Sequence, residues 1–168
     1  MSTTLSSFAA RVRAILQHND TPAGREQVAA LLREALQDRQ FVDSLFDEAS
    51  PERKVVHEDP QLGFCILAHR YTDARNGGPH DHGPSWAIYG QADGETVMTD
   101  WEPGGAASGD GPARVRKVRE YTLTPGVAHV YNEGEVHAPS RSGPCRLIRI
   151  EGVNLERVRR GKYEPVQA

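Results

Sequence analysis

The chain has 168 residues, of which 38% are hydrophobic and 26% charged, and its formal net charge is −3. This length suits a single domain with a buried core, and the charge balance lacks the basic excess of nucleic-acid-binding proteins. No apolar run reaches the roughly 20 residues of a membrane span, and the N-terminus lacks a secretory pattern. We therefore expect a cytoplasmic protein with neither nucleic acid nor membrane as a partner.

The segment up to residue 50 has the apolar spacing of amphipathic helices. Apolar residues recur at intervals of three and four in three groups, which are Leu5, Phe8, Val12 and Ile15, then Val28, Leu31, Leu32 and Leu36, then Phe41, Val42 and Leu45. This spacing places each group on one helix face and predicts three helices, the third over residues 39–46. Thr21 and Pro22 predict the N-cap and the first turn of the second helix.

After Pro51 the chain changes to short runs rich in Val, Ile, Leu, Tyr and Trp, which clusters of Gly, Pro, Asn and Asp separate. These runs predict antiparallel strands at residues 54–57, 63–71, 85–92, 96–101, 113–123, 128–131 and 145–151. The glycine-rich residues 103–112 predict a mobile hairpin loop. We expect one domain over residues 1–168, made of a helical segment (1–50), a β-barrel (51–153) and a tail (154–168).

The tail, residues 154–168, allows two structures and two roles. Its scattered apolar residues suit either a last helical turn or an extended strap over the barrel. Arg159 and Arg160 predict an exposed charged face, with a pocket-closing arginine as the alternative. Cys65 and Cys145 lie in apolar segments and are expected to be free, buried thiols.

Two histidines carry the strongest chemical signal. His80 and His82 are separated only by Asp81, so in an extended segment both imidazoles leave the same face while Asp81 points away. Neutral imidazole suits iron, zinc, nickel or copper, and a third ligand would complete a site with open positions. The sequence offers His129 and His137 as candidates for that third ligand.

The segment that ends at His137 resembles the second sequence motif of the cupin superfamily. In that motif a glycine, a proline and a second glycine precede the metal-binding histidine, and here Gly126, Asn132 and Gly134 hold these places. Arg141 replaces the asparagine that closes the motif. The resemblance favours His137 as the third ligand, with His129 as the alternative. It also implies an all-β double-stranded β-helix, or jelly-roll barrel, behind the N-terminal helices.

The segment after His82 is similar to the first cupin motif, with one change in the ligands. Gly94 matches the motif's glycine, but Ala87 stands where most cupins have a glutamate ligand. A site of three neutral histidines resembles the cysteine dioxygenase and 3-mercaptopropionate dioxygenase branch. That resemblance implies Fe²⁺ as cofactor and the addition of O₂ to the sulfur of a small thiol carboxylate.

The same resemblance and the strand pattern point to candidate substrate-binding residues. Arg53 and Lys54 fall where cysteine dioxygenases carry a carboxylate-binding arginine. Tyr89 follows the histidine pair on one strand and can border the pocket with its hydroxyl. Arg149, on the last predicted strand, can grip a carboxylate if its face is the barrel interior, and a surface ion pair with Glu151 is the alternative.

Two departures separate the chain from that branch. Ala87 excludes the cysteine–tyrosine crosslink of cysteine dioxygenases. The family's serine, histidine and tyrosine of the late strand are replaced by Leu147, Arg149 and Glu151. The resemblance of the histidine site nevertheless makes a thiol dioxygenase-like oxidoreductase the leading hypothesis. The alternatives are a non-oxidative metal-dependent isomerase or lyase that uses Zn²⁺ or Ni²⁺, and a non-catalytic binding protein. A homodimer is compatible with all three hypotheses.

Overall fold

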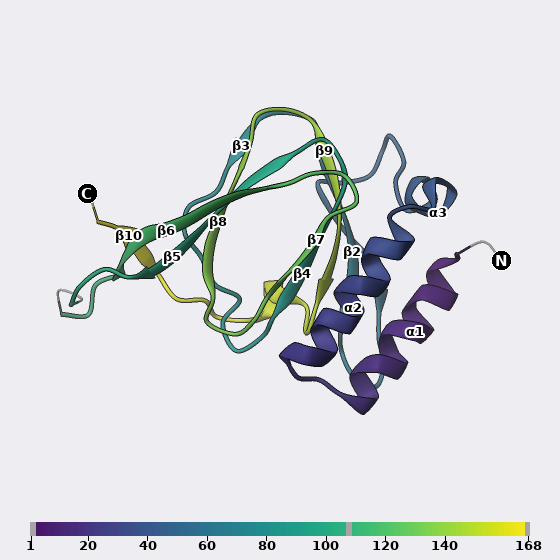
Figure 1. Ribbon diagram of the computed structural model, residues 1–168, viewed down its shortest axis with the longest axis horizontal. Helices are drawn as coiled ribbons and strands as arrows, with labels where there is room; N and C mark the ends of the chain where they lie inside the picture. The colour runs from purple at the N-terminus through teal and green to yellow at the C-terminus, as the bar shows by residue number, and fades with distance from the viewer. Residues whose placement is uncertain (1–2, 107–108, 167–168) are drawn as a thin grey trace.

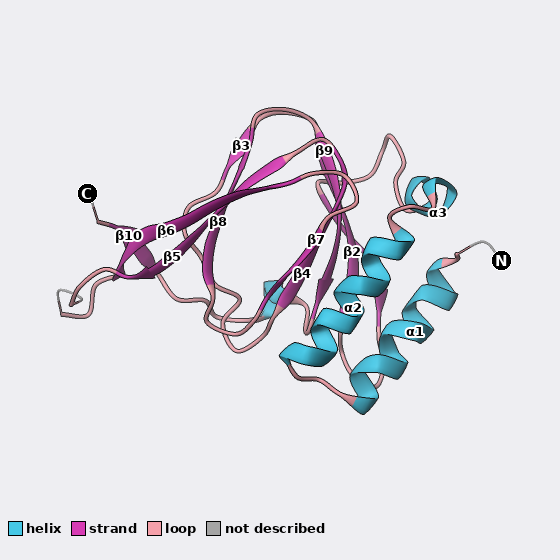
Figure 2. Ribbon diagram, in the orientation of Figure 1, coloured by secondary structure: helices cyan, strands magenta, loops and turns pink. Residues whose placement is uncertain are grey.

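The computed structural model describes residues 3–106 and 109–166, with the helices preceding the strands along the chain. Figure 1 shows the helices against one side of a β-barrel and the C-terminal segment on the far side. Figure 2 shows the same division by secondary structure. None of the described helices is long and apolar enough to cross a membrane.

The three predicted helices form, with small differences at their ends. They are α1 (Leu5–His18), α2 (Pro22–Ala35) and α3 (Arg39–Ser44). Pro22 is the first residue of α2, as predicted, and Thr21 is its N-cap residue. The hydroxyl of Thr21 makes no capping bond and donates instead to Oδ1 of Asn19 at 2.6 Å. The third helix ends at Ser44, short of the predicted Phe46.

The strands build two five-stranded sheets. They are β1 (Arg53–Glu58), β2 (Cys65–Tyr71), β3 (Arg75–Asn76), β4 (Ala87–Asp93), β5 (Thr96–Pro103), β6 (Ala113–Leu123), β7 (Ala128–Tyr131), β8 (Val136–Arg141), β9 (Cys145–Glu151) and β10 (Tyr163–Pro165). One sheet has the order β1-β2-β9-β4-β7 and the other β10-β6-β5-β8-β3. Neighbours pair antiparallel except β10 with β6. The predicted all-β double-stranded β-helix with an N-terminal helical segment is confirmed.

Three strands were not predicted, and β8 is the most important of them. Pro139 interrupts the apolar pattern of β8 and lacks an N–H group. The carbonyl of Pro139 accepts from the Gly77 N–H at 2.8 Å, so the ring nitrogen faces the short edge strand β3 and not β5. The other two, β3 and β10, are too short for any periodicity to reveal.

The predicted hairpin loop and the end of the predicted tail both belong to the second sheet. Strands β5 and β6 pair antiparallel on either side of the predicted loop at 103–112, of which residues 107 and 108 lie outside the described part of the chain. The tail contains both predicted structures, a 3-10 turn at Leu155–Arg157 and then the extended β10. Figure 1 shows this segment crossing from the first sheet to the second.

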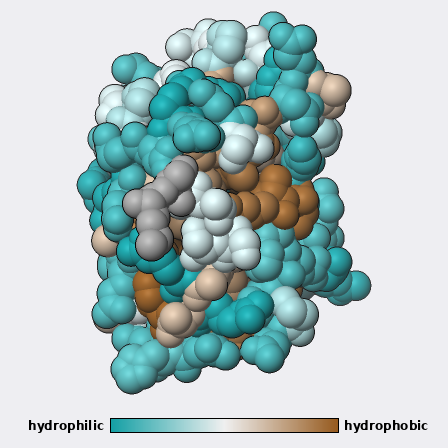
Figure 3. All heavy atoms as spheres, turned by 90° about the vertical axis from the view of Figure 1, so that its right-hand side faces the viewer, coloured by the Kyte–Doolittle hydropathy of each residue, from teal (hydrophilic) through white to brown (hydrophobic). Residues whose placement is uncertain are grey.

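Two hydrophobic cores lie on the two faces of the first sheet. Ile148 and Ile150 of β9 face outward, where they pack under the helices with Phe8 and Val28. Leu147 faces inward and packs inside the barrel. Because β9 is buried on both faces, its apolar residues Leu147, Ile148 and Ile150 do not follow a strict alternation along the strand. Each fully buried aliphatic side chain contributes about 1.5–3 kcal/mol. Figure 3 shows the outer surface over the helices, mostly hydrophilic around a smaller apolar patch.

Candidate metal centre

Backbone pairing brings the histidines of two distant segments together. His80 and His137 exchange both backbone hydrogen bonds, each N–H donating to the other's carbonyl at 2.9 Å. This isolated antiparallel bridge continues the pairing of β8 beyond β3 and puts both side chains on one face. His82, two residues after His80, joins them from the same segment.

The imidazoles of His80, His82 and His137 form one compact cluster. One potential ligand atom from each residue lies within 4.8 Å of the others. The ring centroid of His137 is 4.6 Å from that of His80 and 4.7 Å from that of His82. His82 and His137 are fully buried, and His80 is partly exposed. The cluster therefore lies inside the barrel with one edge towards solvent.

The ring nitrogens of this cluster fit a divalent transition metal. His80 donates from Nδ1 to the Gly78 carbonyl and His137 from Nδ1 to the Glu135 carbonyl, both at 3.0 Å. These bonds fix the tautomer in which Nε2 of each ring carries the lone pair, as backbone carbonyls do for metal-binding histidines. The buried Nδ1 of His82 has no hydrogen-bond partner among the described residues.

Burial keeps all three imidazoles neutral. It lowers the pKa of His80, His82 and His137, and the positive charge of Arg149 lowers each pKa further. Neutral imidazole is the form that coordinates a metal. The cluster is therefore held in the protonation state that a metal requires.

The candidate ligands of the cluster carry no negative charge. The cluster contains no carboxylate among the described residues, since it consists of three histidines. Ala87, at the glutamate position of the cupin motif, is fully buried inside the barrel. Asp81 is turned away from the cluster and accepts hydrogen bonds from elsewhere. A divalent ion at this site would keep its full charge for exogenous ligands.

Tyr89 of β4 lies directly beside two of the three histidines. Its hydroxyl oxygen is 3.0 Å from Nε2 of His82 and 3.3 Å from Nε2 of His137. The side chain is almost fully buried, and burial raises its pKa. The hydroxyl therefore keeps its proton near neutral pH, in contact with the cluster.

Arg149 lies inside the barrel next to Tyr89. Its guanidinium carbon is 4.2 Å from the Tyr89 ring centroid, and its Nη2 is 3.3 Å from Oε1 of Glu151. Its buried Nε has no hydrogen-bond partner among the described residues. The other carboxylate oxygen of Glu151 accepts from Arg53 at 2.8 Å. Glu151 is thus shared between two arginines, which leaves Arg149 with unused donors beside the cluster.

The two candidate residues of β1 lie in different surroundings. Arg53 reaches the barrel side, where it bonds to Glu151 and, at 2.9 Å, to Asn154. Lys54 pairs with Asp47 of the N-terminal segment at 3.2 Å and is partly exposed. Adjacent side chains point to opposite faces of a strand, so Lys54 cannot reach the side on which Arg53 lies. The structure brings Arg53 next to the partner of Arg149 and does not bring Lys54 to the cluster.

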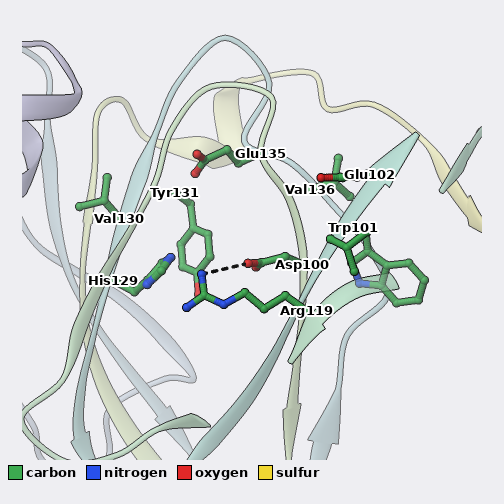
Figure 4. Close-up of a pocket in the computed structure, with 10 residues that line it drawn as sticks. Asp100, Trp101, Glu102, Arg119, His129, Val130, Tyr131, Glu135 and Val136 are labelled. Atoms are coloured by element: carbon green, nitrogen blue, oxygen red, sulfur yellow. Dashed lines mark ion pairs between the residues drawn. The ribbon is translucent and has the colours of Figure 1, made fainter. Parts of the chain in front are cut away.

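His129, the alternative third ligand, lies apart from the cluster. It lines a separate cavity of about 360 Å³ between β7 and strands β5 and β6 (Figure 4). Tyr131 stands between this cavity and the cluster, with its ring centroid 4.6 Å from His129 and 3.9 Å from His137. Figure 4 shows His129 and Tyr131 facing the ion pair of Asp100 and Arg119. The structure thus groups His137, and not His129, with His80 and His82.

The tail residues 158–163 contact the segment that carries the histidine pair, at Asp81 and Gly83. Asp81 accepts from the hydroxyl of Tyr163 at 2.6 Å and from the backbone N–H of Gly161 at 3.2 Å. Gly83 has φ of 58°, and a Cβ there would lie 2.4 Å from the Arg159 carbonyl oxygen, so only glycine permits this approach. We call residues 158–163 the strap. Asp81 and Tyr163 are 82 residues apart, and no pattern in the sequence predicts their contact.

Arg160 lies in the strap between the two points of attachment. Its neighbours Arg159 and Gly161 contact Gly83 and Asp81, so Arg160 is held at the edge of the cluster. Its side chain is exposed and forms no ion pair within the described residues. Burial of the two rings is the largest cause of the lowered pKa of His80 and His82, and the positive charge of Arg160 is a smaller cause. The sequence predicted an exposed charged side chain at this position, and Arg160 is exposed.

The chain matches no protein-family profile and no curated protein in sequence. Several solved structures are similar to it. An uncharacterized conserved protein with a double-stranded β-helix domain from Klebsiella pneumoniae is 17% identical over 73% of this chain and 88% of its own, with a TM-score of 0.49. A cupin superfamily protein from Desulfitobacterium hafniense is 13% identical over 65% and 83%, with a TM-score of 0.46. KdgF from Halomonas sp. is 18% identical over 62% and 83%, with a TM-score of 0.44. At these values the likenesses carry no inference about ligand or activity.

Proposed function

We propose that this chain is a metal-dependent enzyme in which His80, His82 and His137 hold one divalent transition metal. The observation that carries the proposal is the grouping of three neutral imidazoles, two of them fully buried, with ligand atoms within 4.8 Å of one another. Such a cluster costs free energy to desolvate, and the buried Nδ1 of His82 has no hydrogen-bond partner among the described residues. A metal ion that binds the imidazole lone pairs would offset that cost.

We propose Fe²⁺ as the metal and a thiol dioxygenase-like reaction as the activity. A bound ferrous ion would supply the redox chemistry that adds both atoms of O₂ to a thiolate sulfur, which converts R–S⁻ into the sulfinate R–SO₂⁻. The neutral ligand set supports this choice, because an anionic thiolate is then attracted by the full charge of the ion. Zn²⁺ and Ni²⁺ accept the same ligands, so the metal is the first thing to measure.

The residues around the cluster suit a small thiol that also carries a carboxylate. Arg149 lies in the barrel interior with an Nε that has no hydrogen-bond partner among the described residues, and Arg160 is close enough for its charge to lower the pKa of His80 and His82. Either cation can bind the carboxylate and orient the substrate, and arginine does so with two parallel hydrogen bonds. Arg53 holds Glu151 and thereby positions Arg149. The Tyr89 hydroxyl would donate its hydrogen bond to a substrate atom beside His82 and His137.

A second candidate function follows from the late strand. Leu147, Arg149 and Glu151 of β9 occupy the places where thiol dioxygenases carry a serine, a histidine and a tyrosine. Leu147 is fully buried and has no polar group to offer. A site with Tyr89 as proton donor and without that relay suits a non-oxidative isomerase or lyase, in which the metal acts as a Lewis acid. A third outcome is a protein that binds its metal and ligand without turnover.

The test begins with the metal content of protein purified without a histidine tag. Oxygen uptake and sulfinate formation are then measured on the iron-loaded protein with cysteine and with 3-mercaptopropionate, and the zinc-loaded protein is the control. Stoichiometric iron with thiol-dependent uptake supports the dioxygenase. Stoichiometric metal without uptake favours the non-oxidative candidates. Protein that binds none of these metals would refute the three-histidine centre itself.

We also propose that the protein works in the cytoplasm. Cys65 and Cys145 are both free and buried, which suits a reducing compartment. Burial raises the pKa of Cys65 to about 11, so its thiol stays protonated and inert. The partners that we propose are a small-molecule substrate and O₂.

A further inference from the structure

The barrel has a seam at which its two sheets do not pair. Strand β7 is the last strand of the first sheet, and β10 borders β6 only at Ala113–Val115, so among the described strands residues 116–123 of β6 have no partner on that side. The cavity of about 360 Å³ that His129 lines lies at this seam, and we call it the seam cavity. Its volume is within the roughly 300–1,000 Å³ of small-molecule sites, and the proposed metal chemistry does not use it.

One wall of the seam cavity carries a cation and an anion side by side. Asp100 of β5 and Arg119 of β6 are opposite each other in the strand register, on the face that also carries the buried Met98. Nη1 of Arg119 is 4.0 Å from Oδ2 of Asp100, which is beyond hydrogen-bond distance. Beside the pair, Val118 is an extra residue of β6, a bulge of the kind that re-aims side chains at the rims of barrels.

Both charged groups keep hydrogen-bonding capacity for a ligand. The guanidinium carbon of Arg119 lies 4.6 Å from the Tyr121 ring centroid, and the group makes no hydrogen bond among the described residues. Asp100 accepts at Oδ1 from the Tyr121 hydroxyl at 3.0 Å, which leaves Oδ2 as an unused acceptor. The wall therefore offers a planar fork of N–H donors next to a carboxylate oxygen.

The two other acids of the lining have partners that do not line the cavity. Glu102 pairs with Arg116 at 3.2 Å, and Glu135 accepts from the Asn132 N–H at 2.7 Å. Both acids are exposed, whereas the side chain of Asp100 is only 28% exposed. Asp100 is therefore the acid that a cationic group inside the cavity would meet.

The opposite wall is aromatic and contains an unused imidazole. His129 pairs with Tyr89 in the strand register and so faces the barrel interior, with its ring centroid 4.6 Å from that of Tyr131 and 5.0 Å from that of Tyr121. Burial lowers the pKa of His129, so the ring stays neutral near pH 7. Neither ring nitrogen makes a hydrogen bond among the described residues. Figure 4 shows this wall facing the charged pair.

We propose that the seam cavity binds the head group of a free α-amino acid, as a second site apart from the metal centre. A zwitterionic amino acid carries a carboxylate and an ammonium group on the same carbon, so it can meet a cation and an anion that lie side by side. Arg119 binds the carboxylate with two parallel hydrogen bonds, and Oδ2 of Asp100 accepts from the ammonium group. Asp100 would repel a simple anion and Arg119 a simple amine, which favours a ligand that carries both charges.

The test uses the full chain stripped of metal with a chelator, so its outcome does not depend on the proposed enzyme function. Glycine and alanine are titrated into isotope-labelled protein while the NMR shifts of the backbone amides are followed. Acetate and methylammonium, each of which carries one half of the head group, are titrated separately. So few ligand atoms limit the affinity, and we expect a dissociation constant of about 1 mM for the amino acids, with shifts concentrated in β5, β6 and β7. Each half alone should bind at least about 10-fold more weakly.

Two variants and a matched control assign the binding to the charged pair. Arg119→Gln and Asp100→Asn should each weaken glycine binding at least about 10-fold, because a charged hydrogen bond is lost. Arg116→Gln, which removes an exposed arginine of the same strand, should leave it unchanged. If Asp100→Asn does not fold, Arg119→Gln still decides, since that side chain is 61% exposed. Acetate or methylammonium that binds as well as glycine, equal binding by Arg119→Gln and wild type, or no saturable shift in wild type would overturn the proposal.

Discussion

Asp81 accepts a 2.6 Å hydrogen bond from Tyr163, and this contact joins the segment of the histidine pair to the strap. Asp81 lies between the two histidines, and its carboxylate also accepts from the backbone N–H groups of Gly83 and Gly161. One residue therefore shapes the histidine segment and attaches the strap to it.

Tyr163→Phe removes this bond and leaves the ring in place. Hydrogen bonds to charged groups contribute about 1.5–3 kcal/mol, and the partial exposure of Tyr163 puts the expected loss near the lower end, about 1.5 kcal/mol. Urea unfolding of the metal-free protein measures it. Lys162→Ala, in the same strap, is the control and should change the free energy of unfolding by less than about 0.5 kcal/mol.

Arg160→Gln tests the role of the strap in substrate binding. We expect KM for the thiol carboxylate to rise at least about 10-fold with little change in kcat, because a charged hydrogen bond to substrate is lost. Arg159→Gln is the matched control, since its backbone carbonyl and not its side chain meets Gly83. Equal effects of the two substitutions would show that only the net charge of the strap matters.

His137→Asn and His129→Asn separate the two candidate third ligands. His137 is in the cluster, and His129 lies beyond Tyr131 in another cavity. We expect His137→Asn to reduce bound metal from one equivalent to near zero and His129→Asn to retain it, as measured by elemental analysis after dialysis. Loss of metal in the His129 variant alone would reverse the assignment.

Asp59 provides a test of pH dependence away from the metal centre. It is almost fully buried, and although burial alone would raise the pKa of its carboxyl, hydrogen bonds from Leu62 and Gln61 N–H groups and from Arg13 lower it overall. Because the pKa is lower in the folded state, the stabilisation is complete above the unfolded value of about 3.9 and is lost as pH falls through the folded value. Free energies of unfolding of wild type and Asp59→Asn should therefore differ at pH 6 and converge in acid. Asp110→Asn, at an exposed acid, should show no such difference.

Arg25 connects the helices to the barrel. Both of its terminal nitrogens bind the carboxylate of Glu133, at 2.6 and 2.8 Å, and its side chain is only 6% exposed. Arg25→Gln should lower the free energy of unfolding by about 2 kcal/mol, since the charge-assisted bonds to Glu133 and to Asp20 are lost from a buried position. Arg11→Gln breaks a pair with Glu34 in which both side chains are mostly exposed, so it should cost less than about 1 kcal/mol.

The fold was predictable because its strands and helices are marked by apolar residues at regular spacing. The runs at 113–123, 128–131 and 145–151 coincide with β6, β7 and β9. The unpredicted strand β8 shows the limit of this reasoning. Whether Pro139 ends a strand depends on which neighbour its missing N–H would face, and only the tertiary pairing with β5 and β3 decides that.

The candidate site was predictable only as far as its motif reaches. The spacing of His80 and His82 requires no tertiary knowledge, whereas the choice between His129 and His137 depends on the path of β8. The contact of Asp81 with Tyr163 spans 82 residues and leaves no local pattern in the sequence. Arg149 was recognised because strand alternation alone puts it on the same face as Leu147.

The strap also fixes an order of events during synthesis. The ribosome makes the chain from its N-terminus, so the pair His80 and His82 emerges well before His137, and Tyr163 emerges later still. Between these two events comes β9, the central strand of the first sheet, without which the barrel cannot close around the histidines. The strap is therefore the last part of this region to be made, and Tyr163 can reach Asp81 only after every strand that positions the histidines has been synthesised.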